Sequence, residues 1–200
     1  TENIVHLVLA RTPDAPPGVR GISLFIVPKY LINDDGTLGA HNDLRCISLE
    51  HKLGIHASPT AVMSFGDDDG AIGYLVGEEN HGLEYMFVMM NEARFEVGVE
   101  GLAIAERAYQ QALGYARERV QGTPMGGERG AAIIGHPDVR RMLLSMKSRI
   151  DAMRGLCYAY AGFADTAHRH PDAEIRASHM VLVELLTPII KGWCTENGIE

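Results

Sequence analysis

Two arginines are the side chains whose type and position best suit chemistry. Arg94 interrupts a row of apolar residues that recurs every three or four positions from Met86 onward. A charge on the buried face of a helix needs a partner, because an unpaired buried charge costs a large free energy. Arg119 lies in the segment RERVQG, and its planar guanidinium suits bidentate binding of a phosphate. Alternatively, Arg119 is a solvated residue near a helix C-terminus, where basic side chains are favoured.

Several other polar residues have both a chemical and a structural interpretation. Ser58 precedes a proline in a turn, where a serine hydroxyl commonly bonds the local backbone. His136 stands directly before a predicted helix, so it is either a ligand contact or a helix-start residue. His168 and His170 lie beside a proline near a predicted helix end, without a third candidate ligand in view. We therefore expect no metal site.

The composition disfavours several classes of protein. The 200 residues carry a net charge of −8 without a long basic run, which argues against nucleic acid or an anionic membrane surface as partner. No apolar run reaches the ~18 residues of a membrane span, and no signal peptide opens the chain. Cys46, Cys157 and Cys194 form no CxxC pair, which indicates neither a zinc site nor a disulfide framework. We expect reduced thiols in a cytoplasmic protein.

Residues 1–79 are predicted to form a β-domain. Apolar runs alternate with turn segments rich in Pro, Gly, Asn and Asp, as in an antiparallel sheet, and the absence of βαβ alternation disfavours a parallel one. The opening TENIVHLVLA is already strand-like and has no starting Met, so we expect an internal fragment of a longer chain. A hairpin signal, NDDGTLG, lies around Asn33. The pattern predicts about five strands in one sheet, at 4–10, 22–27, 44–49, 60–65 and 72–76.

Residues 80–200 are predicted to be helical. The first helix extends from Met86 to about Gly122, and its apolar residues on two faces predict burial between neighbours. The second begins at Pro137, a residue that suits the first helical position. The third begins near Ala173, and its apolar row is Val181, Leu185, Ile189 and Trp193. The fold class is therefore α+β, part of an antiparallel β-domain followed by an incomplete antiparallel helical bundle.

Four segments in succession carry a resemblance to a known family: GISLFIVPK, EHKLGIHASPTAVMSFGD, GYLVGEENHGLEYMFVMMNEAR and GLAIAERAYQQALGYARERVQG. In this order and spacing they resemble the acyl-CoA dehydrogenases, from the middle β-domain into the first C-terminal helices. The segments MMNEAR, ERVQG and IIGHPDVRRML are similar to a long bacterial subgroup, which includes enzymes for 3-methylmercaptopropionyl-CoA. The resemblance covers nearly the whole chain.

The resemblance implies an acyl-CoA substrate, oxidised to a trans-2-enoyl thioester. Ser58 matches a serine that hydrogen-bonds the CoA portion, Asn91 a polar residue near the adenosine end, and Arg94 an arginine that contacts CoA. A CoA phosphate or ribose would then be the partner that Arg94 needs.

The resemblance also implies FAD as cofactor. Arg119 matches the arginine that reaches the flavin pyrophosphate, usually of a neighbouring subunit. Gln121 stands where the family often has a threonine, and His136 matches a residue near the adenine half. Electron-transfer flavoprotein or a similar acceptor and a homodimer or homotetramer are the partners that the family implies.

No catalytic base is expected among these residues. A few relatives carry the base at the position of Ala93, and Glu92 is one residue earlier. One residue turns a helix by about 100°, so Glu92 should point elsewhere. In most relatives the base lies further along the chain than Glu200. A non-catalytic oligomerisation module and an acyl-CoA oxidase remain as alternatives, while a DNA-binding relative is disfavoured by the negative charge.

Overall fold

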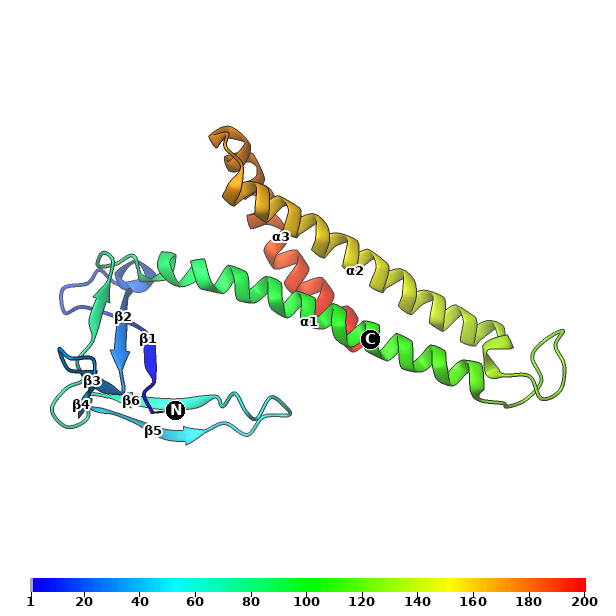
Figure 1. Cartoon of the computed structure of the whole chain (residues 1–200), viewed down its shortest axis with the longest axis horizontal. Helices are drawn as coiled ribbons and strands as arrows, with labels where there is room; N and C mark the ends of the chain where they lie inside the picture. Colours follow the sequence, from blue (N-terminus) through cyan, green and yellow to red (C-terminus); the bar gives the residue numbers. More distant parts are fainter. Residues whose placement is uncertain (1) are drawn as a thin grey trace. The chain divides into compact units, whose positions relative to one another are not determined.

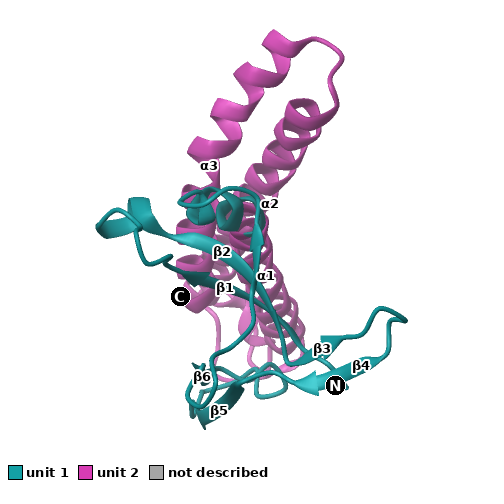
Figure 2. Cartoon of the chain, turned by 90° about the vertical axis from the view of Figure 1, so that its left-hand side faces the viewer, with its two compact units in different colours: residues 1–89 teal, residues 90–200 magenta. Residues whose placement is uncertain are grey.

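The computed structural model describes residues 2–200 and divides the chain into two compact units, residues 1–89 and 90–200 (Figure 2). The boundary falls within the long helix α1 (Gly82–Glu118), so the first turns of this helix belong to the first unit. The combination of antiparallel strands and three long helices confirms the predicted α+β class.

The first unit contains seven short antiparallel strands, whose order along the chain is visible in Figure 1. They form three small sheets and not the one sheet of about five strands that the sequence predicted. One sheet has the order β1-β2-β7, and the other two are the pairs β3-β4 and β5-β6. The strands are β1 (Val5–Ala10), β2 (Ser23–Pro28), β3 (Tyr30–Ile32), β4 (Leu38–His41), β5 (Leu44–Leu49), β6 (Ala61–Phe65) and β7 (Tyr74–Val76).

The predicted hairpin around Asn33 is confirmed as the turn between β3 and β4. The Asn33 N–H donates to the Thr37 carbonyl at 2.9 Å, and the Asp35 carboxylate accepts from the Thr37 N–H and hydroxyl. Gly36 has a φ of 80°, a conformation that glycine adopts without steric cost. The sequence thus predicted this turn but not the two strands that flank it, β3 and β4, because both are short.

The start of α1 is held against β2 by close backbone packing. A Cβ on Gly82 would lie 2.3 Å from the Ser23 carbonyl carbon, so only glycine allows this approach. The fully buried Ser23 hydroxyl accepts a hydrogen bond from the Asn80 N–H at 2.8 Å. A short 3-10 helix, η1 (Gly18–Gly21), precedes β2. The first turn of α1 is therefore held against β2 within the first unit.

The second unit contains the rest of α1 together with α2 (Pro137–Arg169) and α3 (Ala173–Ile199). Pro137 occupies the first turn of α2, as predicted, and His136 is the residue before it. Asp172 caps α3 by accepting hydrogen bonds from the N–H groups of Glu174 and Ile175. This short connection makes α2 and α3 antiparallel neighbours, which both views show (Figures 1 and 2).

The core of the second unit lies mainly between α2 and α3. The residues of α2 that face it are buried: Ile150, Met153, Cys157 and Tyr160. On α3, however, the predicted apolar row is exposed, from 39% at Trp193 to 63% at Val181. The face of α3 that packs on α2 is instead Val183, Thr187, Ile190 and Cys194. Because α3 is apolar on most sides, its spacing alone could not identify the buried face.

Two glycines allow α1 to approach α3 closely. A Cβ on Gly98 would lie 2.5 Å from Ile190 Cγ2, and one on Gly101 would lie 2.5 Å from the Cys194 carbonyl oxygen. An ion pair also joins α1 to α2: the Arg154 guanidinium of α2 lies 2.6 Å from the Glu106 carboxylate of α1. In the apolar row of α1 that begins at Met86, Val97 and Ile104 are exposed, so the predicted burial on both faces is wrong for this chain.

Candidate functional site

The segment that follows α1 folds back on itself and brings three predicted site residues together. The Arg119 carbonyl accepts from the Ile133 N–H at 2.7 Å, and Val120 forms an isolated β-bridge with Ala132. The His136 imidazole, through Nε2, is hydrogen-bonded to the Gln121 carbonyl oxygen at 2.9 Å. Arg119, Gln121 and His136 therefore lie at the closed neck of one loop, although 17 positions separate the first from the last.

A glycine at this neck adopts the left-handed backbone conformation that the turn requires. Gly122 has a φ of 69°, and a Cβ added to it would lie 3.6 Å from His136 Cε1. The short 3-10 helix η2 (Ile133–Gly135) then leads into α2, with His136 at the cap position. The His136 side chain makes no capping hydrogen bond. Its ring is oriented by the loop neck, not by a helix-capping bond.

The guanidinium of Arg119 gives this neck a positive charge that is available to bind an anion. The side chain is exposed, and its contact with Gln121 Oε1 is long, at 3.5 Å. Within residues 2–200, no carboxylate pairs with it. A planar donor group that is anchored by its own backbone and not neutralised can bind an anion such as a phosphate. Gln121 adds neutral hydrogen-bonding capacity beside it.

Asn91 and Arg94 lie three residues apart on α1, so their side chains share one face of the helix. Both are partly buried, whereas Glu92 between them is exposed. In the part of the chain that the structure describes, the Arg94 guanidinium has neither a hydrogen-bond nor an ion-pair partner. The Arg94 donors are thus available to a ligand and Glu92 faces solvent, while the contact of Arg94 with CoA stays a prediction.

Ser58 lies in the loop of the β5–β6 hairpin, within the first unit. Its N–H donates to the Ile55 carbonyl at 3.3 Å, and its carbonyl accepts from Lys52 Nζ at 2.5 Å. Ile55 has a φ of 53°, a strained value for a β-branched residue. Lys52, six residues before Ser58 in the same loop, was not among the predicted site residues. The structure therefore places Ser58 in a different unit from Asn91 and Arg94.

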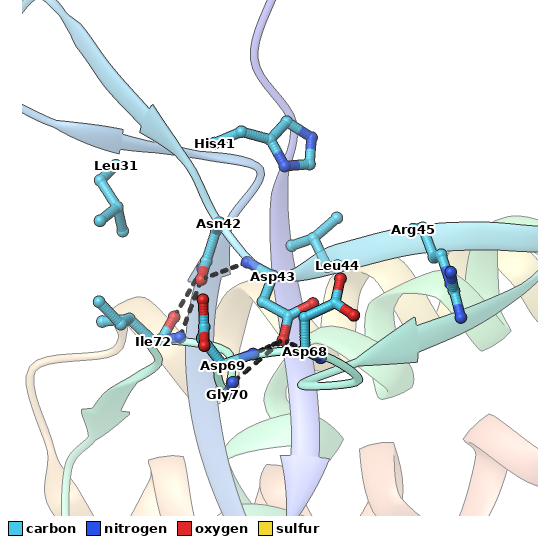
Figure 3. Close-up of a pocket in the computed structure, with 10 residues that line it drawn as sticks. All are labelled: Leu31, His41, Asn42, Asp43, Leu44, Arg45, Asp68, Asp69, Gly70 and Ile72. Carbon is cyan, nitrogen blue, oxygen red and sulfur yellow. Dashed lines mark hydrogen bonds between the residues drawn. The ribbon is translucent and has the colours of Figure 1, made fainter.

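A separate hollow of about 440 Å³ lies in the first unit, where β4 meets β5 (Figure 3). The buried Asn42 side chain donates to the carbonyls of Pro28 and Ile72 and accepts from the N–H groups of Asp43 and Ile72. Its hydrogen-bonding capacity is thus used inside the protein, which indicates a structural role.

One oxygen of the Asp43 carboxylate beside it accepts three backbone hydrogen bonds. Its Oδ2 accepts the N–H groups of Asp68, Asp69 and Gly70, at 2.8, 3.0 and 3.0 Å (Figure 3). These bonds, above all the one from Asp68, lower the pKa of the Asp43 carboxyl, because they stabilise its charged form. The carboxylate occupies the position an anion would take in this turn. The hollow is consequently a structural junction and not a candidate binding site.

The side chains of His168 and His170 are both hydrogen-bonded to backbone groups. His168 Nδ1 is bonded to the Ala164 carbonyl, and His170 Nδ1 accepts from the Asp172 N–H. No group of three or more His, Cys, Asp or Glu residues within 2–200 is arranged to hold a metal ion. Among the helices of the same residues, none combines the length and the apolar character needed to cross a membrane.

Comparison with known proteins gives a consistent result. Residues 80–191 match the family model for the acyl-CoA dehydrogenase C-terminal domain. The whole chain is 57% identical to part of 3-methylmercaptopropionyl-CoA dehydrogenase of Ruegeria pomeroyi, and 97% of it is 40% identical to part of a butyryl-CoA dehydrogenase of Syntrophomonas wolfei. Caenorhabditis elegans ACDH-11, solved in complex with C11-CoA, shares the fold over 98% of the chain, with a TM-score of 0.76 and 24% identity.

These similarities cover different shares of the proteins compared. The chain spans about a third of the length of the curated relatives it matches, 34% and 33%, and 32% of the solved chain. The family model, by contrast, matches more than half of the present chain, and it covers α1, α2 and most of α3. On that match, and on the motifs of the preceding β-unit, the chain belongs to the acyl-CoA dehydrogenase family.

Proposed function

We propose that the whole protein is an FAD-dependent acyl-CoA dehydrogenase that converts an acyl-CoA thioester to a trans-2-enoyl-CoA. The observation that carries this proposal is the 57% identity to 3-methylmercaptopropionyl-CoA dehydrogenase along the entire chain. That relative also makes 3-methylmercaptopropionyl-CoA the first substrate to test, with butyryl-CoA, named by the second relative, as the alternative short-chain thioester.

The loop neck at residues 119–136 is the proposed cofactor contact. Arg119 offers a guanidinium that no carboxylate in residues 2–200 neutralises, which fits the pyrophosphate of FAD. Gln121 and His136 offer an amide and an oriented imidazole, which fit its ribose and adenine portions. When bound, FAD supplies the acceptor for the hydride that leaves the β-carbon of the substrate.

The proposed contacts to CoA are Arg94, Asn91 and Ser58. Arg94 is supported by its partial burial without a partner, because a phosphate or ribose oxygen of CoA would satisfy its donors. Asn91 lies on the same face of α1 and would contact the same ligand portion. Ser58, whose carbonyl is held by Lys52, would contribute its hydroxyl from the β5–β6 loop.

In this proposal the residues of this chain bind and orient FAD and the acyl-CoA, and none of them transfers the proton. Ala93 has no titratable group at the position where some relatives carry the base. Glu92 is exposed, and its direction on α1 differs by about 100° from that of Ala93. We place the base in another part of the whole protein. A cytoplasmic homodimer or homotetramer that passes electrons to electron-transfer flavoprotein completes the proposal.

A non-catalytic oligomerisation module is the second candidate function. The observation that favours it is the exposed apolar surface of α1 and α3, which suits contacts with other helices. The two candidates differ in flavin content. A dehydrogenase purifies with FAD or binds it tightly with a change in the flavin spectrum, whereas an oligomerisation module does not.

The decisive experiment is anaerobic mixing of the whole flavin-loaded protein with a panel of acyl-CoA thioesters. Bleaching of the flavin absorbance together with loss of two hydrogens from the thioester, measured by mass, is the expected result. Absence of both with every short-chain substrate would reject the proposed activity. Repetition in air distinguishes the oxidase alternative, because an oxidase would re-oxidise rapidly and release hydrogen peroxide.

A matched pair of variants tests the cofactor contact. Arg119→Ala is expected to weaken FAD binding about 10- to 100-fold, since a hydrogen bond to a charged group contributes about 1.5–3 kcal/mol. Arg117→Ala, which removes an exposed arginine from the last turn of α1, is the control and should retain the full flavin content. Equal FAD dissociation constants for the two variants would exclude Arg119 as a cofactor contact.

A further inference from the structure

The loop of residues 119–136 is closed at its neck by hydrogen bonds between its two ends. The Arg119 carbonyl accepts from the Ile133 N–H at 2.7 Å. His136 Nε2 lies 2.9 Å from the Gln121 carbonyl oxygen. The first bond holds the backbone at Arg119, and the second holds it two residues further along the chain. The histidine side chain therefore extends the closure that the backbone begins.

The bond to Gln121 determines which ring nitrogen of His136 carries a hydrogen. A carbonyl oxygen can only accept, so Nε2 must be the donor. The neutral tautomer with its hydrogen on Nε2 and the doubly protonated imidazolium both make this bond, whereas the tautomer with its hydrogen on Nδ1 does not. His136 thus acts at the neck as a hydrogen-bond donor, a role that a glutamine amide can take over and a phenylalanine ring cannot.

Gln121 links His136 to the Arg119 guanidinium. Its carbonyl oxygen accepts from His136, and its side-chain Oε1 accepts from Arg119 Nη2 through a long contact of 3.5 Å. A displacement of the Gln121 backbone would therefore move the side-chain oxygen beside the guanidinium, and also the chain segment that carries Arg119. His136 is in this way connected to Arg119 through two hydrogen bonds.

The rest of the loop is packed independently of this bond. Pro124 is buried, and a Cβ on Gly135 would lie 2.9 Å from Pro124 Cγ. This close contact joins the loop to the residue that precedes His136 without using the imidazole. Loss of the imidazole bond alone is therefore expected to loosen the neck and to leave the fold of the second unit intact.

We propose that His136 is a positioning residue for cofactor binding, whose hydrogen bond to the Gln121 carbonyl holds the Arg119 guanidinium where it binds the pyrophosphate of FAD. This role rests on the proposed function, in which Arg119 contacts that pyrophosphate, and it does not require contact between His136 and the adenine. An arginine on a fixed backbone loses less conformational freedom when it binds, so its preorganisation raises the affinity for FAD.

The test is a double-mutant cycle on the FAD dissociation constant of the whole protein, with Arg119→Ala and His136→Phe. Alone, His136→Phe should raise the dissociation constant about 3- to 10-fold, as expected for one neutral hydrogen bond. In the Arg119→Ala protein the same change should raise it less than about twofold, because the two residues act together. Equal increases in both backgrounds would overturn the proposal, since His136 would then act independently of Arg119.

Two single substitutions complete the set. His136→Gln should bind FAD within about twofold of the unsubstituted protein, because the glutamine amide keeps a donor for the carbonyl. His168→Phe is the matched control: this exposed histidine of α2 is also bonded to a backbone carbonyl, that of Ala164, and its loss should leave FAD binding unchanged. A glutamine variant that binds as weakly as His136→Phe would overturn the role of the hydrogen bond.

Hydrogen exchange of the Ile133 N–H in the FAD-free protein separates failure of this role from failure of the proposed function. His136→Phe should speed this exchange about 3- to 10-fold, because the neck opens more often. Unchanged exchange would overturn the proposal even if FAD binds. Absence of FAD binding by the unsubstituted protein would instead refute the proposed function, and this role with it, even if the exchange shows a closed neck.

Discussion

Gly101→Ala is expected to destabilise the second unit strongly, although alanine is the better helix former. A Cβ at this position would lie 2.5 Å from the Cys194 carbonyl oxygen and 2.8 Å from its carbonyl carbon. Both atoms belong to the backbone of α3, so no side-chain rotation relieves the overlap. Since ordinary contacts begin at 3.4 Å, α1 and α3 would have to separate by about 0.9 Å here.

The magnitude follows from two opposing effects. Replacing an interior helical glycine by alanine gains about 1 kcal/mol from helix propensity. Overpacking a well-filled interface costs typically about 1–3 kcal/mol, and more where the backbone must move. The separation would also weaken the neighbouring contact of Gly98 with Ile190. We expect a net loss of about 2 kcal/mol in the free energy of unfolding, which lowers the midpoint by roughly 4–8 °C for a chain of 200 residues.

Gly114→Ala is the matched control on the same helix. A Cβ there meets no atom within 4 Å, so only the propensity gain applies. Thermal unfolding followed by far-ultraviolet circular dichroism should show Gly114→Ala about 2–4 °C above the unsubstituted protein and Gly101→Ala below it. Equal or higher stability for Gly101→Ala would show that α1 and α3 do not pack at this distance, and the reasoning would fail.

Three further substitutions test hydrogen-bonded polar side chains. Thr187 donates its only hydroxyl hydrogen to the Val183 carbonyl at 2.7 Å, so the buried Tyr160 hydroxyl must donate to Thr187 Oγ1, 3.1 Å away. Thr187→Val should cost about 1–3 kcal/mol in urea unfolding, and Tyr160→Phe less, because only the former leaves a buried donor unsatisfied; equal costs would contradict this assignment. The lowered pKa of Asp43 contributes stability above about pH 4 that is lost as pH falls through its folded value, so Asp43→Asn should flatten the acid side of the stability profile. An unchanged acid profile would show that the three N–H bonds contribute nothing.

The helices were predictable because their signals are local. Steps of three and four residues persist for 37 residues in α1, and Pro137 marks the start of α2. The division of the strands into three sheets was not predictable, since strand pairing joins segments far apart in sequence, such as β2 with β7. The buried face of α3 was not predictable either. It is decided by the partner helix, which presents the Tyr160 hydroxyl to Thr187 and thereby selects a face with a polar residue.

The candidate site shows the same division between local and non-local information. The motif around Arg119 identified residues that the closed loop then brings together, but nothing local indicated the Val120–Ala132 bridge that closes it. Lys52 was missed because its hydrogen bond goes to a backbone carbonyl, and a carbonyl acceptor leaves no signature in side-chain types.

The partly buried arginines of the second unit give the strongest physical link between the fold and the proposed ligand. Arg154 pairs with Glu106 and Asp151, and Arg176 donates to the carbonyls of His170 and Pro171. Arg94 is partly buried as they are, but no group in residues 2–200 accepts from it. Its nitrogen atoms keep contact with solvent, since they are not among the buried side-chain atoms of residues 2–200 that have no hydrogen-bond partner. An anionic ligand such as CoA, whose oxygen atoms could accept from Arg94 in place of water, is the partner that we propose for it.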